Sequence, residues 1–168
     1  MSCAEKPLDQ DAKLCEQEFG VFSVSDAQQL YDLDRACLLS PWTFDGFREE
    51  LGHDYSYCWG RRNQQRGVID AFIMSHVVFD EAHLLKIGVE VASRQCGVGG
   101  RLLSYAIERY QELGVKYVHL EMRRSNEIAK AFYRSFGFIE NGQRRDYYGR
   151  EEGYEQVSED AILYLKML

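Results

Sequence analysis

The chain has 168 residues, of which 45% are hydrophobic and 28% are charged, and its formal net charge at pH 7 is −7. Such values are typical of a globular protein with a well-buried core, and the acidic balance argues against a nucleic-acid binder while allowing a basic protein partner. The sequence has no apolar run of about 18 residues and no basic segment followed by an apolar one at its start, so we expect neither a membrane span nor a secretory signal.

Hydrophobic periodicity predicts the elements of the first half of the chain. In order they are a strand over 19–24, a helix over 25–39, a short helix over 43–51, and strands over 55–59, 68–79 and 83–91. Ser25, with Gln28 in capping-box spacing, predicts the start of the first helix, and Pro41 predicts its end. Residues 1–18 are polar and charged, so we expect a flexible tail there and a single folded domain over 19–168.

The second half of the chain alternates helices and strands. Its predicted elements are a helix from about 98 to Gly114, a strand over 117–122, a helix that Ser125 caps and Gly137 ends, a strand from Phe138 onward, and a strand over 161–167. The resulting order is β-α-α-β-β-β-α-β-α-β-β. It predicts an α/β fold with a mixed central sheet flanked by helices.

The segment from Arg94 to Gly100 reads R-x-x-G-x-G-G and stands between a predicted strand and a predicted helix. Glycines there let backbone N–H groups approach an anion, and the helix dipole favours negative charge at that end. The segment lacks the third glycine of the dinucleotide fingerprint and the Lys-Ser or Lys-Thr of a P-loop. It therefore indicates another kind of pyrophosphate cradle, although an ordinary glycine turn before a helix remains open.

The cysteines and histidines indicate no metal centre and no disulfide framework. The cysteines are an odd number, scattered, and never in C-x-x-C spacing: Cys3, Cys15, Cys37, Cys58 and Cys96. The four histidines show no metal-ligand spacing either. We therefore expect a protein of the reducing cytoplasm that binds no metal.

The glycine-rich segment resembles the acetyl-CoA loop of the GNAT superfamily of N-acetyltransferases, Q/R-x-x-G-x-G/A. From about residue 19 the chain resembles in particular the ribosomal-protein-alanine N-acetyltransferase (RimI-like) family. The segments that carry the resemblance are Pro41-Trp42, Asp80–Ala82, Ile87–Val89, Gln95–Gly100, Leu120–Arg123, Ser125-Asn126, Ala131–Tyr133, Gly137-Phe138, Arg144–Tyr148 and Glu159–Ala161. The chain departs from the family in its N-terminal tail and in an insert over Glu151–Ser158, which leaves the peptide preference open.

The resemblance implies direct transfer of an acetyl group from acetyl-CoA to an amine, with no covalent enzyme intermediate. It assigns Glu121, within an otherwise apolar strand, as the general base, and Tyr133 as the acid that protonates the leaving sulfur. The residues alone leave two plainer interpretations open. Glu121 can be a solvent-facing strand residue, and Tyr133 can be part of an aromatic core face.

The resemblance also implies which residues bind the two substrates. Those expected to bind acetyl-CoA are Ile87, Gly88, Val89, Arg94, Gln95, Cys96, Gly97, Val98, Gly99, Gly100 and Asn126. A glycine inside a strand, as at position 88, suits a bulge or a close backbone approach. Trp42 and Tyr147 are expected to flank the peptide, with plain packing as the alternative, and Asn126 can equally be a simple helix start.

The implied acceptor is the N-terminal α-amine of a protein, specifically the N-terminal alanine of a small-subunit ribosomal protein, which is basic. Near pH 7.4 roughly a fifth of an α-amine is neutral, against about a thousandth of a lysine side chain, so a carboxylate base suffices for an α-amine. Two alternatives stay open: a GNAT enzyme that acts on a lysine or a small amine, and a non-catalytic acyl-CoA-binding module. A binding module needs neither Glu121 nor Tyr133.

Overall fold

The computed structural model describes residues 18–149 and 158–168. The tail predicted over 1–18 lies outside the described residues except for Glu18, as does the insert except for Ser158. The chain groups into two compact units. Unit 1 comprises the residues up to 74 together with 86–108, and unit 2 comprises 75–85 together with 109–168. The single domain over 19–168 stays a prediction.

Seven strands form one mixed sheet in the order β1-β2-β3-β4-β5-β7-β6. They are β1 (Gly20–Val21), β2 (Ser56–Asn63), β3 (Val68–Val78), β4 (Glu81–Val89), β5 (Tyr117–Arg123), β6 (Ile139–Tyr148) and β7 (Glu159–Met167). β4 and β5 pair in parallel, whereas β1–β2, β5–β7 and β6–β7 are antiparallel. The prediction of a mixed α/β sheet with flanking helices is confirmed.

The helices are α2 (Ala27–Cys37), α3 (Phe44–Glu50), α4 (Val98–Glu112) and α5 (Glu127–Ser135), with 3₁₀ turns η1 (Val24–Asp26) and η2 (Val91–Ser93). Two of these four α-helices, α3 and α5, begin at a short polar side chain that satisfies a free backbone N–H group. Thr43 caps α3 by accepting the N–H of Gly46 at 3.0 Å. The predicted cap Ser25 is wrong, because η1 precedes α2 and the capping box forms between Ser23 and Asp26.

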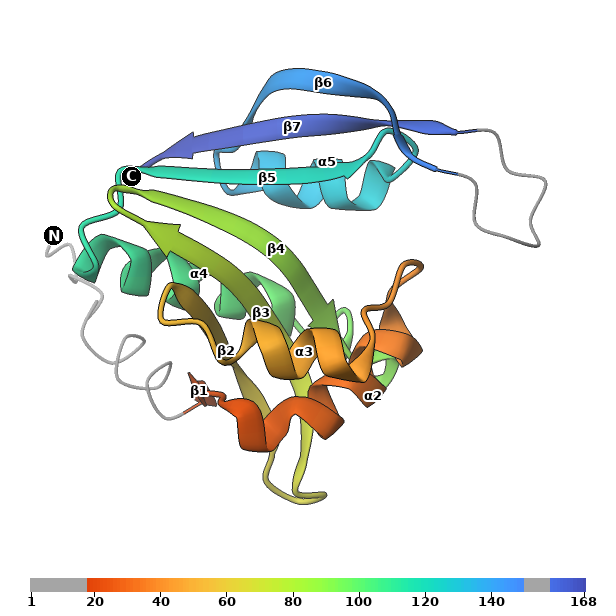
Figure 1. Cartoon of the computed structure of the whole chain (residues 1–168), viewed down its shortest axis with the longest axis vertical. Helices are drawn as coiled ribbons and strands as arrows, with labels where there is room; N and C mark the ends of the chain where they lie inside the picture. Colours follow the sequence, from red (N-terminus) through yellow and green to blue (C-terminus); the bar gives the residue numbers. More distant parts are fainter. Residues whose placement is uncertain (1–17, 150–157) are drawn as a thin grey trace, which may run out of the picture. The chain divides into compact units, whose positions relative to one another are not determined.

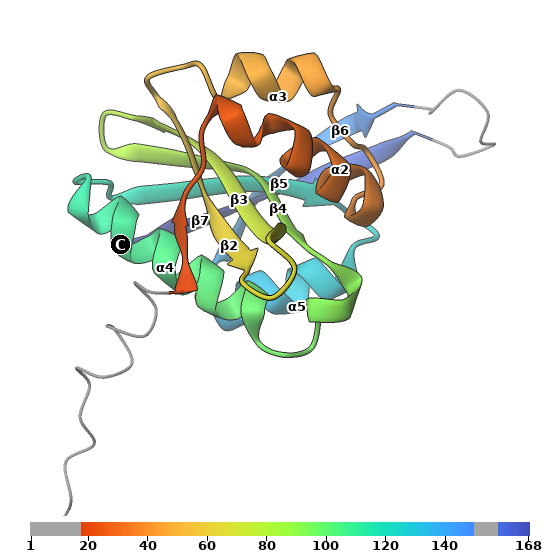
Figure 2. The ribbon, with the colours of Figure 1, turned by 90° about the horizontal axis from the view of Figure 1, so that it is seen from below.

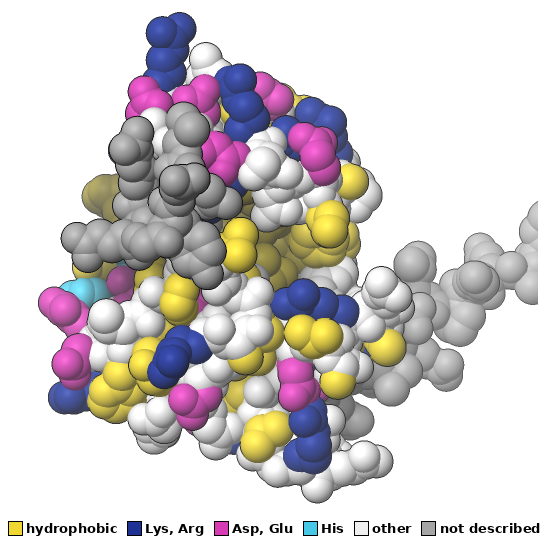
Figure 3. All heavy atoms as spheres, turned by 90° about the vertical axis from the view of Figure 1, so that its right-hand side faces the viewer, with side chains coloured by type: hydrophobic (Ala, Val, Ile, Leu, Met, Phe, Trp, Pro, Cys, Tyr) yellow, Lys and Arg dark blue, Asp and Glu magenta, His cyan; other side chains and the backbone are white. Residues whose placement is uncertain are grey.

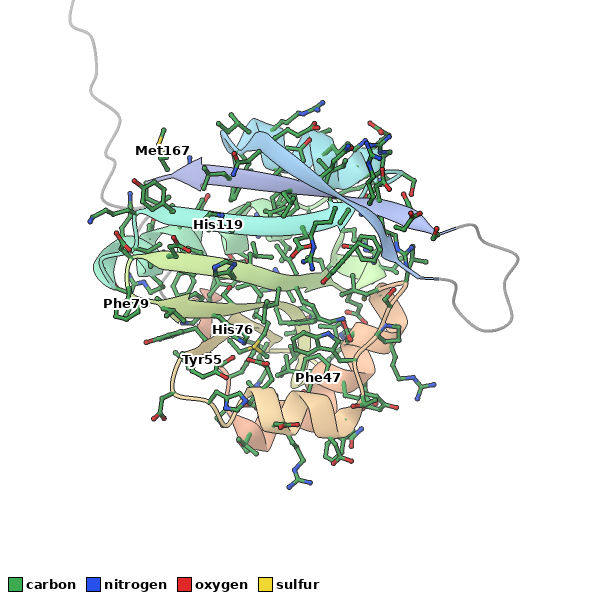
Figure 4. All side chains as sticks on the ribbon, turned by 45° about the horizontal axis from the view of Figure 1, so that its top comes forward. Phe47, Tyr55, His76, Phe79, His119 and Met167 are labelled. Carbon is green, nitrogen blue, oxygen red and sulfur yellow. The ribbon has the colours of Figure 1, made fainter. Side chains whose placement is uncertain are left out.

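In unit 1, helices cover both faces of the strands β2 and β3 (Figure 2). On the face covered by α2 and α3, Phe47 is fully buried and its ring centre lies 6.0 Å from that of Phe72 on β3 (Figure 4). On the face covered by α4, Trp59 of β2 packs edge-on against Tyr105, with ring centres 6.5 Å apart. Burial of such apolar side chains stabilises the packing of the helices on the strands.

In unit 2, α5 lies along one face of β5 and β7 (Figure 1). Its Tyr133 packs edge-on against Phe138, which directly precedes β6, with ring centres 5.5 Å apart. Gly137 ends the helix in the left-handed region, with φ 80°, as predicted. The predicted cap Ser125 is wrong: Asn126 lies one residue closer to the helix, and its Oδ1 accepts the N–H of Ala129 at 3.1 Å.

The strand boundaries that differ most from the prediction are those of β1 and β2. β2 continues to Asn63, four residues beyond its predicted end at 59, because Arg61 pairs with Asp70 on β3 and stays in the sheet. The turn that follows is closed by Asn63, whose Oδ1 accepts the N–H groups of Gln65 and Arg66, each at 3.1 Å. The first strand is reduced to Gly20–Val21 because η1 begins at Val24.

Candidate functional site

The glycine-rich loop leads from η2 into α4 and is exposed from Arg94 to Gly97. Two of its residues have left-handed backbones, Gln95 with φ 60° and Gly97 with φ 73°. Helical hydrogen bonding then begins with the N–H of Arg101, which donates to the Gly97 carbonyl at 3.0 Å. The N–H groups of the first helical turn therefore have no acceptor within the helix, and together with the helix dipole they suit an anion.

Side chains fix both ends of this loop. On the helix side, Arg101 donates to the Cys96 carbonyl at 3.0 Å and to both carboxylate oxygens of Glu18 at 2.8 and 2.9 Å. On the strand side, the Ser93 hydroxyl donates to Asp70 at 2.9 Å. The backbone that precedes α4 is therefore held in place by hydrogen bonds from within unit 1.

Asp70 is fully buried on β3, and it accepts the Ser93 hydrogen bond that anchors the strand side of the loop. Arg61 donates to its two carboxylate oxygens at 2.9 and 2.6 Å. Burial alone would raise the pKa of Asp70, but the hydrogen bonds from Arg61 and Ser93 hold that pKa below its usual range. Asp70 is therefore an ionised anchor for the loop, and Arg61 supplies its compensating charge.

The end of β4, which is expected to bind pantetheine, is shaped by close packing. A Cβ atom at Gly88 would lie 2.6 Å from the ring of Phe72, so only glycine fits there. The Val89 carbonyl accepts the Nε–H of Arg94 at 3.0 Å, and Arg94 Nη2 donates to the Cys37 carbonyl at 3.3 Å. The Arg94 side chain thus braces the loop against β4 and α2 with two of its five N–H donors.

Trp42 belongs to a loop that a buried ion pair holds. Lys86 Nζ on β4 donates to both carboxylate oxygens of Asp34 at 3.0 Å, and Asp34 also accepts the backbone N–H of Trp42 at 2.7 Å. The same ammonium donates to the Ser40 carbonyl at 2.9 Å and lies 5.0 Å from the centre of the Trp42 ring. Burial lowers the pKa of Lys86, although Asp34 opposes that shift.

In unit 2, Glu121 lies on β5 one residue beyond the end of the β4–β5 ladder, whose last pair is Leu84 and Leu120. Its side chain is 32% exposed, so it is neither a core residue nor a fully solvated one. Arg144 on β6 donates from Nη1 to both carboxylate oxygens, at 2.9 and 3.2 Å. Glu121 is therefore an accessible carboxylate that already has a cationic partner.

Tyr133 is buried on α5, between the rings of Phe132 and Phe138. Burial, with a smaller effect of Tyr110, raises the pKa of its phenol well above the usual value. The phenol therefore keeps its proton at neutral pH. Among the described residues no side chain or backbone group hydrogen-bonds its hydroxyl, so the proton is available to a ligand.

Asn126 and Tyr147 both occupy exposed positions in unit 2. Asn126 uses its side-chain oxygen as the cap of α5, which leaves its NH₂ group for any further partner. Tyr147 is 45% exposed and carries the guanidinium of Arg144 over its ring at 4.0 Å. Unit 1 thus contains the loop residues, Ile87–Val89 and Trp42, and unit 2 contains Glu121, Tyr133, Asn126 and Tyr147.

Neither a metal centre nor a membrane helix is found in the described part of the chain. No group of three or more His, Cys, Asp or Glu residues there could hold a metal ion, and no helix is long and apolar enough to cross a membrane.

His119 on β5 (Figure 4) stacks on His83 of β4, with ring centres 4.9 Å apart. Cys37, Cys58 and Cys96 are free thiols.

The comparisons with known proteins agree on one kind of enzyme. Residues 27–138 match the family model described as acetyltransferase (GNAT) family. The chain is 34% identical over 139 residues to the [ribosomal protein bS18]-alanine N-acetyltransferase of Escherichia coli, covering 83% of this chain and 89% of that one.

Solved structures show the same fold. The crystal structure of the Escherichia coli ribosomal-protein-S18-alanine N-acetyltransferase matches with a TM-score of 0.78 at 30% identity, over 88% of this chain and 90% of that one. Arabidopsis thaliana NAA60 in complex with acetyl-CoA matches with a TM-score of 0.77 at 15% identity, over 89% of this chain and 97% of that one, which supports the fold alone.

The buried pair of Asp34 and Lys86 generates a stability prediction. Asp34→Ala leaves the ammonium of Lys86 buried without its charge partner, which should cost about 3–5 kcal/mol of unfolding free energy in urea titrations. The matched control is Asp45→Ala, because Asp45 pairs with Arg48 at 3.4 Å while 86% exposed, and its loss should cost no more than about 1 kcal/mol. Equal costs for the two variants would contradict a structural role for the buried pair.

Proposed function

The chain belongs to the acetyltransferase (GNAT) family, and from that premise we propose that it transfers the acetyl group of acetyl-CoA to the N-terminal α-amine of a protein. The observation that carries the proposal is the 34% identity over 83% of the chain with an N-terminal alanine acetyltransferase. Two features of the structure support it. The glycine-rich loop has free backbone N–H groups, and Glu121 and Tyr133 are suited to proton transfer.

Acetyl-CoA fits the glycine-rich loop because its pyrophosphate is a compact anion. In the proposed complex, backbone N–H groups from Gln95 to Gly100 bind the pyrophosphate, and the backbone of Ile87, Gly88 and Val89 binds the pantetheine arm and acetyl oxygen. The NH₂ group of Asn126 is a further donor for the arm. The reaction class calls for no metal ion, and the proposal includes none.

The chemistry needs one base and one acid. The substrate amine gives a proton to Glu121, directly or through a water, and its lone pair forms the new bond to the carbonyl carbon of the thioester. The carbon–sulfur bond breaks, and the sulfur takes the proton of the Tyr133 hydroxyl. Glu121 suits the first role because its side chain is accessible, and Tyr133 suits the second because burial keeps its phenol protonated.

The proposed acceptor is the N-terminal alanine of a small-subunit ribosomal protein, by analogy with the relatives named above. An α-amine is far easier to deprotonate than lysine at neutral pH, which matches a carboxylate base. A basic ribosomal protein also complements the net charge of −7. Trp42 and Tyr147 are the proposed peptide contacts, and the cytoplasm is the proposed location.

The loop generates a prediction about acetyl-CoA binding. Acetyl-CoA should raise the thermal midpoint of the wild-type protein by mass action, and NAD should not. Gly97→Val should abolish this shift, because a side chain there strains the left-handed backbone and crowds Arg101. Gly67→Val is the matched control: Gly67 has φ 68° in the β2–β3 turn, so both variants carry roughly 1–2 kcal/mol of strain but only one alters the loop. A full shift in Gly97→Val, or an equal one with NAD, would contradict the assignment.

The two proton-transfer groups generate a kinetic prediction. With a peptide that begins with alanine, Glu121→Gln and Tyr133→Phe should each lower kcat by roughly 10²–10⁴-fold, and Glu121→Gln should leave the affinity for acetyl-CoA nearly unchanged. Matched controls are Glu140→Gln, an exposed carboxylate on β6, and Tyr110→Phe, a buried tyrosine whose hydroxyl bonds Ser75. Near-normal kcat in both test variants would show that the assigned roles are wrong.

A further inference from the structure

Arg144 occupies the carboxylate that the proposed function needs. Its Nη1 binds both oxygens of Glu121, and among the described residues no other cation pairs with Glu121. The neighbouring cations have other acceptors, since Arg123 lies 3.5 Å from Glu159 and Arg124 lies 3.0 Å from Asp160. Basic and acidic side chains lie next to one another over the upper part of the face in Figure 3, where β6 and β7 lie in Figure 1.

The strand register explains how Arg144 reaches Glu121. Glu121 on β5 is opposite Leu163 on β7, and Arg144 on β6 is opposite Ala161 on the same strand. Leu163 and Ala161 are two residues apart, so they face the same side of the sheet, as do the residues opposite them. The long arginine side chain therefore crosses one strand, over the small side chain of Ala161, to reach the carboxylate.

Tyr147 gives the same guanidinium a second partner. The carbon at the centre of the guanidinium lies 4.0 Å from the middle of the Tyr147 ring, within the range of a cation–π interaction. The register of β6 shifts between Arg144 and Tyr148, and this irregularity includes the left-handed Asp146, with φ 52°. Arg144 can therefore leave Glu121 and still be held by an aromatic ring.

The ion pair is of the kind that exchanges readily. Its side chains are 51% and 32% exposed, and pairs of that exposure contribute little net free energy. A protein N-terminus arrives mainly as an ammonium ion, since about four-fifths of an α-amine is protonated near pH 7.4. If this ammonium group replaces the guanidinium of Arg144, the Glu121 carboxylate is paired with one positive charge both before and after the exchange.

We propose that Arg144 is a positioning residue that occupies Glu121 in the free protein and yields it to the ammonium group of the incoming N-terminus. This inference rests on the proposed function, because it takes Glu121 as the group that meets the amine. Arg144 keeps the carboxylate oriented until a substrate arrives and makes a cationic N-terminus the group that can displace it. Its removal leaves the carboxylate unpaired and open to the ammonium without competition.

The test separates substrate binding from turnover. Peptides that begin with alanine are assayed for acetylation, and their Kd for the CoA-bound protein is measured by calorimetry, with Arg144→Gln, Arg144→Lys and the wild type. Arg144→Gln should lower both KM and Kd by about two- to fivefold at low salt, the range expected when one exposed ion pair no longer competes. The gain should disappear near about 1 M salt, where exposed pairs are screened. Arg144→Lys should restore the wild-type values.

Two controls isolate the exchange from general charge effects. Arg124→Gln removes a nearby cation of 53% exposure that pairs with Asp160, and it should leave Kd unchanged. A peptide whose N-terminal amine is replaced by a hydroxyl group should bind the wild type and Arg144→Gln equally, because it offers no ammonium to Glu121. A KM or Kd for the alanine peptide that rises or stays constant in Arg144→Gln would overturn the inference, as would an equal gain in Arg124→Gln or with the hydroxyl peptide.

The same assay distinguishes failure of the Arg144 exchange from failure of the proposed function. Acetylation by the wild type combined with an unchanged KM in Arg144→Gln rejects the exchange and leaves the proposed function standing. Absence of acetylation of every N-terminal peptide rejects the proposed function and, with it, this inference.

Discussion

Two fully buried carboxylates, Asp34 and Asp70, constrain the part of the chain proposed to bind substrates. A buried charge is tolerated only with a partner, and each carboxylate has one cation, Lys86 for Asp34 and Arg61 for Asp70. Each also binds an exposed loop, because Asp34 accepts the N–H of Trp42 and Asp70 accepts the hydroxyl of Ser93. Two loops with high surface exposure are thus tied to the core of unit 1.

The two proposed proton-transfer groups of unit 2, Tyr133 and Glu121, have different surroundings. Tyr133 is enclosed by aromatic rings, and burial keeps its phenol protonated. Glu121 lies beyond the last pair of the β4–β5 ladder, remains partly exposed and has a cation beside it. An accessible carboxylate and a buried phenol that keeps its proton are the two groups that the proposed reaction needs.

The sequence predicted most of the fold because its patterns are local. Hydrophobic periodicity located the helices and strands, and the left-handed Gly97 and Gly137 stand where glycine signals were read. Boundaries failed where two signals competed, as at Ser125 and Asn126, which are both good caps one residue apart. The roles of the individual candidate residues were inferred from family resemblance and stay predictions.

The ion pairs around the candidate residues escaped prediction because they join distant segments. Asp34 and Lys86 are 52 positions apart, and Glu121 and Arg144 are 23 apart, so no periodicity relates them. A lysine in an apolar strand was the one available signal for the buried pair, since such a residue calls for a partner. Arg144 stands in a charged stretch that looks solvated in the sequence, and only the β5–β7–β6 register shows its partner.

Every role assigned above depends on acetylation of a protein N-terminus by this chain. The most direct measurement uses acetyl-CoA and one peptide that begins with alanine and contains an internal lysine, with the acetyl group located by tandem mass spectrometry. We expect the acetyl group on the α-amine, an unmodified lysine, and no transfer when the N-terminus is blocked. Acetyl on the lysine with the N-terminus left free would contradict this expectation.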